Sequence, residues 1–225
     1  MDAGTMAVRS FGELKWDEKM RFLDDSSCPV DVIRAGAEDE DEDVRGAAVG
    51  NPNAPEDVIR RGARDLYVDV RGAAVGNPGA PEDVIRGAVG DEDEWVRQAA
   101  VGNPSAPEDV IRAGVGDRSS WVRETAVGNP SAPEDVIRAA VGDEDEWVRQ
   151  AAVGNPGAPE DVIRQGAVDA DWLVQLAAAR HLRLSEDVIE ELSKSEVVAI
   201  QWALAGNLSV PERMRVVARL RAGCG

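Results

Sequence analysis

Three tryptophans that recur at intervals of 26 residues are the side chains best suited to bind a partner: Trp95, Trp121 and Trp147. Carboxylates precede two of them, Asp93 and Glu94 before Trp95, and Asp145 and Glu146 before Trp147. The face of an indole ring attracts cations, and tryptophan is enriched among residues that dominate binding energy. The combination predicts a surface for a cationic or proline-rich peptide.

The tryptophan column is restricted to the middle of the chain. Earlier copies of the position hold Asp43 and Asp69, later ones hold Leu173 and Ala199, and Trp172 is displaced by one residue. A side chain needed by every repeat would recur in every repeat, so the restriction favours a local binding surface that also includes Trp172. The alternative interpretation is that these indoles pack between repeats.

No residues have the spacing of a catalytic or metal site. His181 is the only histidine, and the two cysteines, Cys28 and Cys224, lie near opposite ends of the chain. The sequence has no dinucleotide-binding, phosphate-binding, nucleophile-elbow or zinc-protease motif. Acidic runs such as 38–43 lack the ligand spacing of a calcium-binding loop. We therefore expect no catalytic residue, no cofactor and no metal.

The chain of 225 residues carries a net charge of -18. Such a surface repels nucleic acid and anionic membranes, and it attracts a basic partner. Neither a run of eighteen apolar residues nor a signal peptide is found, and the few cysteines suit a reducing compartment. We expect a cytoplasmic protein that contacts neither nucleic acid nor membrane directly.

The chain is built from repeats of 26 residues. "VGNP" begins at 49, 75, 101, 127 and 153, "APEDVIR" begins at 54, 80, 106, 132 and 158, and degenerate copies of the second motif begin at Cys28, Leu184 and Val210. A constant step of this length is typical of a solenoid, whose units bury their apolar faces on one another. We expect a disordered tail over 1–9, a capping helix over 10–27 and a single solenoid over 28–225. Its units degenerate from about residue 176.

Each unit should contain two short helices and no strand. The first should begin with a capping box at Ser105 and Glu108 or their equivalents, followed by a proline in its first turn. The second should begin at a recurring aspartate such as Asp91 and end at a left-handed Gly102 before Pro104.

Two polar columns should hold neighbouring units together. The first pairs an aspartate with an arginine six residues later: Asp91 and Arg97, Asp117 and Arg123, and Asp143 and Arg149. The second is an asparagine at the corner of each unit: Asn77, Asn103, Asn129 and Asn155. Because both columns are repeated, a structural ladder is favoured over a catalytic site. His181 replaces the asparagine in one unit, which favours a packing substitution.

The pattern "VRQAAVGNPSAPEDVIRAGVGD" resembles the leucine-rich repeat variant, a family of bacterial repeat proteins. The resemblance implies a right-handed superhelix without strands, in which one helix of each unit can be 3₁₀. The "D-x-x-x-x-V-R-x-x-A" half is similar to the second helix of a HEAT repeat. The best-known family member carries an iron–sulfur cluster on a cysteine-rich N-terminal segment. Only Cys28 stands there in this chain, so no redox function carries over.

These features predict a non-enzymatic repeat scaffold that binds another protein, one with a basic or peptide-like surface, through the tryptophans and neighbouring acids. The alternative is an acidic mimic of nucleic acid that occupies the basic groove of a DNA-binding protein. Acids placed at helix starts by "PED" segments account for part of the charge and weaken that alternative.

Overall fold

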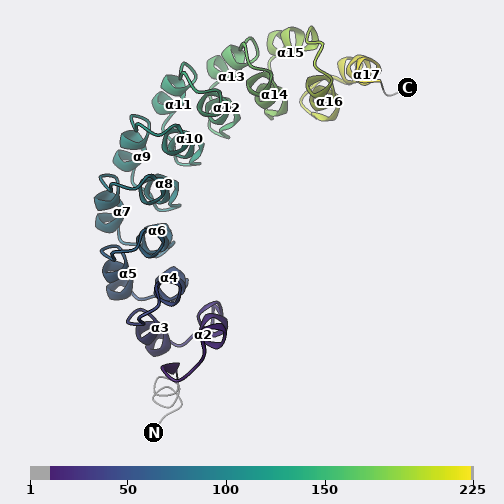
Figure 1. The fold of residues 1–225 in the computed structure, drawn as a ribbon. Coiled ribbons are helices and arrows are strands. Elements are labelled where there is room, and N and C mark those ends of the chain that lie inside the picture. Colours follow the sequence, from purple (N-terminus) through teal and green to yellow (C-terminus); the bar gives the residue numbers. More distant parts are fainter. Residues whose placement is uncertain (1–10, 224–225) are drawn as a thin grey trace. The chain divides into compact units, whose positions relative to one another are not determined.

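The computed structural model describes residues 11–223, which form sixteen α-helices and no strand (Figure 1). The tail expected over 1–9 lies outside these residues. The chain divides into two compact units between Gly114 and Val115.

The helices alternate between two kinds. The first unit contains α2 (Trp16–Leu23), α3 (Val30–Gly36), α4 (Glu42–Gly50), α5 (Glu56–Gly62), α6 (Val68–Gly76), α7 (Glu82–Ala88), α8 (Glu94–Gly102) and α9 (Glu108–Gly114). The second contains α10 (Ser120–Gly128), α11 (Glu134–Ala140), α12 (Glu146–Gly154), α13 (Glu160–Gly166), α14 (Trp172–Arg180), α15 (Glu186–Ser193), α16 (Val198–Gly206) and α17 (Glu212–Arg221). Both helices of each repeat are α-helices, so none of them is the 3₁₀ helix that the resemblance allowed.

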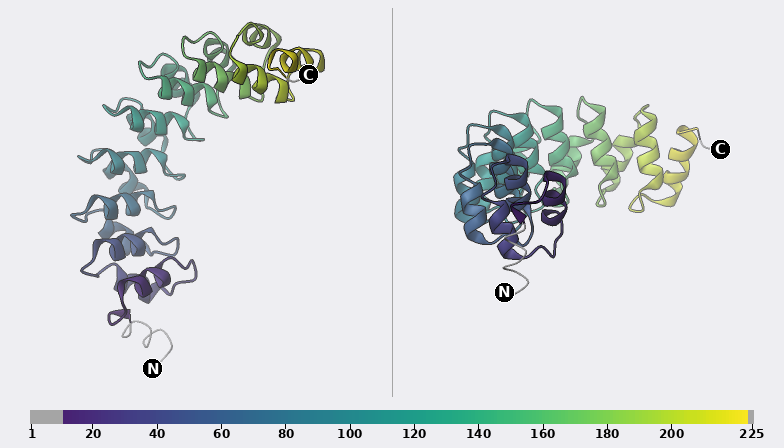
Figure 2. Two further views of the ribbon diagram at one scale, coloured as in Figure 1. Left: turned by 45° about the vertical axis from the view of Figure 1, so that its right-hand side comes forward. Right: turned by 60° about the horizontal axis from the view of Figure 1, so that its bottom comes forward.

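Within each unit the helices form two layers. The nine-residue helices α4, α6 and α8 pack side by side in the first unit, as do α10, α12, α14 and α16 in the second (Figures 1 and 2). The even-numbered helices also contact the odd-numbered helices beside them, which form the other layer. The outward face of the nine-residue layer therefore combines residues from several repeats.

The apolar core runs between these layers and is almost entirely aliphatic. Seven isoleucines at steps of 26 residues are fully buried: Ile33, Ile59, Ile85, Ile111, Ile137, Ile163 and Ile189. Small side chains such as Ala100 and Ala152 are equally buried and let neighbouring helices approach closely. A core built from Ile, Val and Ala leaves the tryptophans outside it.

The helix starts differ from the prediction. The seven-residue helices α5, α7, α11 and α13 have proline as N-cap, with no side-chain cap. Ser105 is not part of a capping box: its backbone N–H donates to Oδ1 of Asn103 (2.8 Å), and its hydroxyl donates to the carbonyl of Pro78 (3.5 Å). The hydrogen bonds of Ser105 therefore hold the turn that precedes the helix and do not cap the helix itself.

The nine-residue helices begin two residues later than predicted. Asp93 is the N-cap of α8, while Oδ1 of Asp91 accepts the backbone N–H of Asp93 at 3.0 Å, one turn before the helix. Their ends also differ, because Gly102 is the last helical residue and not a left-handed cap. Asn103 follows it with φ -61° and ψ 132°. Within residues 11–223 only Gly223 has a positive φ.

Candidate functional site

The predicted tryptophans lie at the surface. Trp95 is 60% exposed, Trp121 59%, Trp147 49% and Trp172 45%, so burial between repeats does not describe them. Trp95 belongs to the first unit, and the other three belong to the second. Their role in binding a partner stays a prediction.

The carboxylates near the tryptophans divide into two groups. Oδ1 of Asp93 accepts the backbone N–H of Trp95 at 2.9 Å, and Oδ1 of Asp145 accepts that of Trp147 at 2.9 Å. Both carboxylates therefore hold the start of the helix that carries the indole. Glu94 and Glu146 are exposed in the first turn, where a negative charge also suits the helix dipole.

The aspartate and arginine columns form hydrogen bonds from one repeat to the next. Arg149 donates from Nε and Nη2 to Asp169 of the next repeat (2.9 and 3.1 Å), and from Nη1 to the carbonyls of Asp143 (3.0 Å) and Glu144 (3.1 Å). Equivalent bonds join Arg123 to Asp143 and to the carbonyl of Asp117. These half-buried pairs connect successive nine-residue helices within a unit.

The same column extends into the first unit. Hydrogen bonds from Arg71 hold the pKa of Asp91 below its usual value although burial opposes this. Arg97 donates to the carbonyl of Asp91 at 3.0 Å. Lys19, 26 residues before Arg45, takes the arginine's place at the N-terminal end and donates to Asp39 at 2.6 Å. Comparison of the repeats in the sequence did not identify Lys19 as a member of this column, because the position holds a lysine and not an arginine.

The corner asparagines are buried and connect neighbouring repeats. Nδ2 of Asn155 donates to the carbonyls of Val127 (2.7 Å) and Asn129 (3.1 Å), and its Oδ1 accepts the N–H of Gly157 (2.8 Å). Asn77 and Asn103 make the same three bonds in the first unit, and Asn129 accepts the N–H of Ser131 at 2.9 Å. Each side chain thus satisfies three backbone groups at a corner.

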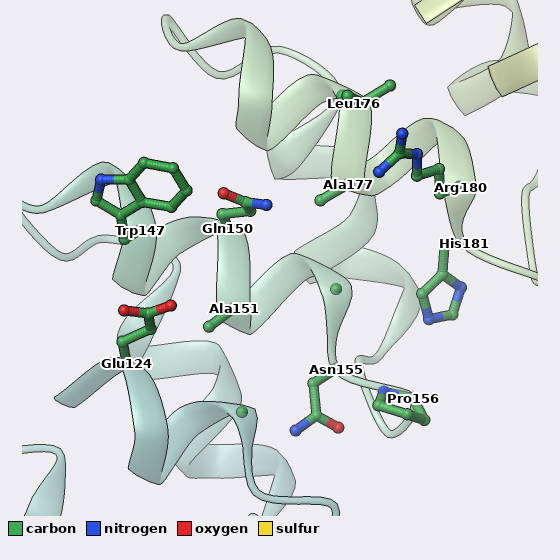
Figure 3. A pocket seen from close by; sticks show the side chains of 12 residues that line it. Glu124, Trp147, Gln150, Ala151, Asn155, Pro156, Leu176, Ala177, Arg180 and His181 are labelled. Atoms are coloured by element: carbon green, nitrogen blue, oxygen red, sulfur yellow. The ribbon is translucent and has the colours of Figure 1, made fainter. Parts of the chain in front are cut away.

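A pocket of about 390 Å³ opens on the nine-residue layer of the second unit (Figure 3). It lies across α10, α12 and α14, and its floor consists of small residues, among them Ala151, Gly154 and Ala177. Glu124 and Trp147 lie at one end of the labelled side chains in Figure 3. Sequence analysis did not identify this groove, because its walls come from three different repeats.

Arg180 and His181 lie at the other end of the groove (Figure 3). The guanidinium of Arg180 is exposed and makes no ion pair within residues 11–223. The groove therefore has an acidic, aromatic end and a basic end.

Two polar groups in the groove have unsatisfied interactions. Glu124 is half-buried, and no hydrogen bond or ion pair to it is found in the described part of the chain. Burial raises the pKa of Glu124, and the negative charge of Asp145 raises it further. Oε1 of Gln150 is buried without a hydrogen-bond partner among the same residues. A bound cation would pair with the carboxylate of Glu124, and an N–H donor would satisfy Oε1 of Gln150.

His181 accepts the same backbone hydrogen bond as the asparagine that it replaces. Its Nδ1 accepts the backbone N–H of Arg183 at 3.2 Å, as Oδ1 does in the other corners. A neutral ring then carries its proton on Nε2, which is buried and has no hydrogen-bond partner of good geometry in the described chain. Burial lowers the pKa of His181 from its ordinary value of 6.5. These contacts favour the packing substitution.

Restoring asparagine at this corner, His181→Asn, is expected to stabilise the protein by about 1 kcal/mol at pH 7.5 by adding donor bonds to the Val153 and Asn155 carbonyls. The wild-type protein should also lose stability as pH falls below 6.5, since the unfolded chain binds a proton that buried His181 resists. The variant lacks this contribution, so its advantage should grow at pH 5.5. Urea unfolding at both pH values measures the difference, and an equal or smaller advantage at pH 5.5 contradicts this account.

The described residues contain no group of three or more histidine, cysteine, aspartate or glutamate side chains placed to hold a metal ion. Over the same stretch, no helix is both long and apolar enough to cross a membrane.

Comparison with known proteins places the fold. No protein family and no curated protein matches the chain in sequence. A solved structure described as a leucine-rich repeat variant with a novel repetitive structural motif is similar over 91% of this chain and 82% of its own, with a TM-score of 0.62 and 22% identity. A HEAT-like repeat protein from Thermococcus onnurineus NA1 aligns with 100% of this chain and 97% of its own, at 16% identity and a TM-score of only 0.34. The prediction of an all-α repeat solenoid is confirmed, and the fold is similar to that of the solved leucine-rich repeat variant.

Proposed function

We propose that this protein is a non-enzymatic repeat scaffold that binds a basic, peptide-like segment of another protein through tryptophans and carboxylates on its nine-residue helices. The observation that carries the proposal is the exposure of Trp95, Trp121 and Trp147 in a protein whose core uses almost no aromatic residues. Exposed indoles that the core does not need are typical of binding surfaces.

The charge of the chain supports a basic partner. The net charge is -18, and Glu124 lies beside Trp147 without a cation of its own in the described chain. A lysine or arginine from a partner would meet an indole face and a carboxylate together. The proposal includes the expected cytoplasmic location, where the buried thiol of Cys28 would remain reduced.

The net charge also favours a second candidate, the acidic mimic of nucleic acid. On the seven-residue helices, however, many carboxylates are already paired with arginines: Asp57 with Arg34, Asp83 with Arg60, Asp109 with Arg86, Asp161 with Arg138 and Asp187 with Arg164. A mimic presents unpaired charges at regular spacing to a basic groove. The paired layer therefore makes the tryptophan surface the better supported of the two.

Affinity capture from host lysate with the wild-type protein and a Trp95→Ala, Trp121→Ala, Trp147→Ala variant tests the proposal. We expect a partner that binds the wild type when both are purified, and that binds the triple variant at least tenfold more weakly, since indoles are frequent hot spots. Trp202→Ala is the matched control, because Trp202 is 50% exposed but lies outside the column.

The salt dependence of that binding separates the two candidates. A mimic would lose affinity steeply between low and high salt and would bind the triple variant as well as the wild type. That pair of results would overturn the tryptophan surface in favour of the mimic.

A further inference from the structure

We propose that the groove across α10, α12 and α14 binds an extended peptide segment that carries a cationic side chain and an acidic side chain about five residues apart. This inference rests on the proposed function and specifies the ligand class for the second unit. It follows from two charged residues that stand at opposite ends of one groove.

The acidic end is suited to a lysine or arginine side chain. Glu124 lies three residues after Trp121 on the same face of α10, and Trp147 holds the equivalent position of Trp121 on the adjacent helix α12. Both indoles are about half exposed, and Glu124 is half-buried between the helices that carry them. Asp145 lies close enough to Glu124 for its negative charge to raise the pKa of Glu124, so this end of the groove is acidic. A ligand cation here gains both a carboxylate and an aromatic face.

The column of Glu124 shows that this acid is specific to one repeat. The positions at steps of 26 residues are Gly46, Gly72, Gln98, Glu124, Gln150, Leu176 and Trp202. Only Glu124 among them is acidic. Because the other repeats fold with glycine, glutamine or an apolar residue there, the carboxylate is not a requirement of the repeat.

The basic end is equally specific. Arg180 is the last residue of α14, and its equivalents are Gly50, Gly76, Gly102, Gly128, Gly154 and Gly206. A guanidinium thus stands where every other full repeat ends its helix with glycine. It has no carboxylate partner among the described residues, so it can pair with an acidic side chain of a ligand.

The surface between the two ends admits a peptide backbone. A Cβ at Gly128 would meet no atom within 4 Å, and one at Gly154 would only touch that of Ala177 at 3.9 Å, so the small residues leave this part of the groove open. The carboxamide of Gln150 lies beside them with its Oε1 unsatisfied (Figure 3). It can accept a backbone N–H of an extended ligand after a small rotation.

The spacing of the ligand charges follows from the helix packing. Packed helices lie about 9 Å apart, so two steps from α10 to α14 cover roughly 18 Å. An extended chain advances about 3.3 Å per residue, so a segment of about five residues spans the groove. The peptide therefore runs across the helices and not along them.

Capped octapeptides of alanine, serine and glycine test the inference. One carries arginine and, five residues later, glutamate; two others replace one charge with glutamine; a fourth carries two arginines. Isothermal titration of the full-length protein should show that the arginine–glutamate peptide binds about tenfold better than either single-charge peptide. Arg180→Glu should reverse the order in favour of the two-arginine peptide.

Matched variants separate the groove from the overall charge. Glu124→Lys and the control Glu144→Lys change the net charge equally, as do Arg180→Glu and Arg183→Glu, and both control residues are exposed. The groove variants should lose at least fivefold more affinity than their controls. Circular dichroism confirms that each variant is folded.

Equal losses in groove and control variants, or no binding of any octapeptide by the wild type at millimolar concentration, would overturn the inference. Neither result contradicts the proposed function if binding of the purified partner still requires Trp95, Trp121 and Trp147. Loss of that requirement, in turn, would leave octapeptide selectivity for the groove unaffected. The two proposals therefore fail separately.

Discussion

Replacing Asn155 with aspartate is expected to destabilise the protein by about 3–5 kcal/mol at pH 7.5. The side chain keeps its shape, and one oxygen still accepts the N–H of Gly157. The other oxygen takes the place of an amide that donates to two carbonyls, those of Val127 and Asn129. A buried carboxylate would then face two oxygens with no proton between them. Urea unfolding followed by circular dichroism measures the loss.

The pH dependence of the same variant identifies the cause. A carboxyl buried against carbonyls has a raised pKa in the folded state, so the folded variant binds a proton that the unfolded chain has released. The defect of Asn155→Asp should therefore shrink as pH falls from 7.5 to 4.5. A defect that is unchanged over this range would show that the carbonyl contacts are not responsible.

The chain itself supplies the control for this experiment. Asp25 lies 26 residues before Asn51 and occupies the same column at the N-terminal end of the repeats. It accepts the N–H of Ser27 at 2.8 Å, is exposed, and has a lowered pKa because of that bond. Because this carboxylate is exposed to solvent and accepts the N–H and hydroxyl of Ser27, its negative charge is tolerated. Asp25→Asn should leave stability nearly unchanged.

Sequence periodicity predicts the ladders well because each residue of a column meets the same surroundings in each repeat. Arg71 and Arg123 therefore make the same hydrogen bond: each donates to the aspartate twenty residues later in the sequence. The capping residues were mispredicted for the opposite reason. In "DEDE" both Asp91 and Asp93 can cap a helix, and local sequence does not choose between them. Arg71 of the preceding repeat engages Asp91, and Asp93 then caps the helix.

The candidate site was less accessible to sequence reasoning. A period of 26 residues shows that Trp121 and Trp147 are equivalent, but it does not show whether that position faces solvent. The groove depends on which helices pack side by side, and the missing partner of Glu124 depends on the surroundings in three dimensions. One signal was available: Arg180 interrupts a column of glycines, and column-by-column comparison of charge would have identified it.

The second large effect concerns the half-buried ion pairs between repeats. Arg149→Ala should destabilise the protein by about 2–4 kcal/mol, because the change leaves Asp169 largely buried without its cation and frees two carbonyls. The side chains of Arg149 and Asp169 are only 18% and 10% exposed. Urea unfolding at 0.05 and 0.5 M salt should give nearly the same loss, since a pair shielded from solvent is weakly screened.

Arg138→Ala tests whether burial, and not the number of ion pairs, determines this effect. Arg138 also bonds two carboxylates, Asp161 at 2.9 Å and Glu134 at 3.1 Å, but its side chain is 45% exposed and theirs are 58% and 67% exposed. Arg138→Ala should lower the free energy of unfolding far less than Arg149→Ala does, and this loss should vanish at 0.5 M salt. The loss of stability in Arg149→Gln should fall between those of Arg149→Ala and Arg138→Ala. Gln175, which occupies the equivalent position in the next repeat, donates only to the carbonyl of Asp169, so a glutamine keeps one carbonyl bond and loses the ion pair. Equal losses for Arg149→Ala and Arg138→Ala would mean that the exposed pairs of the seven-residue layer stabilise the repeats as strongly as the half-buried ladder.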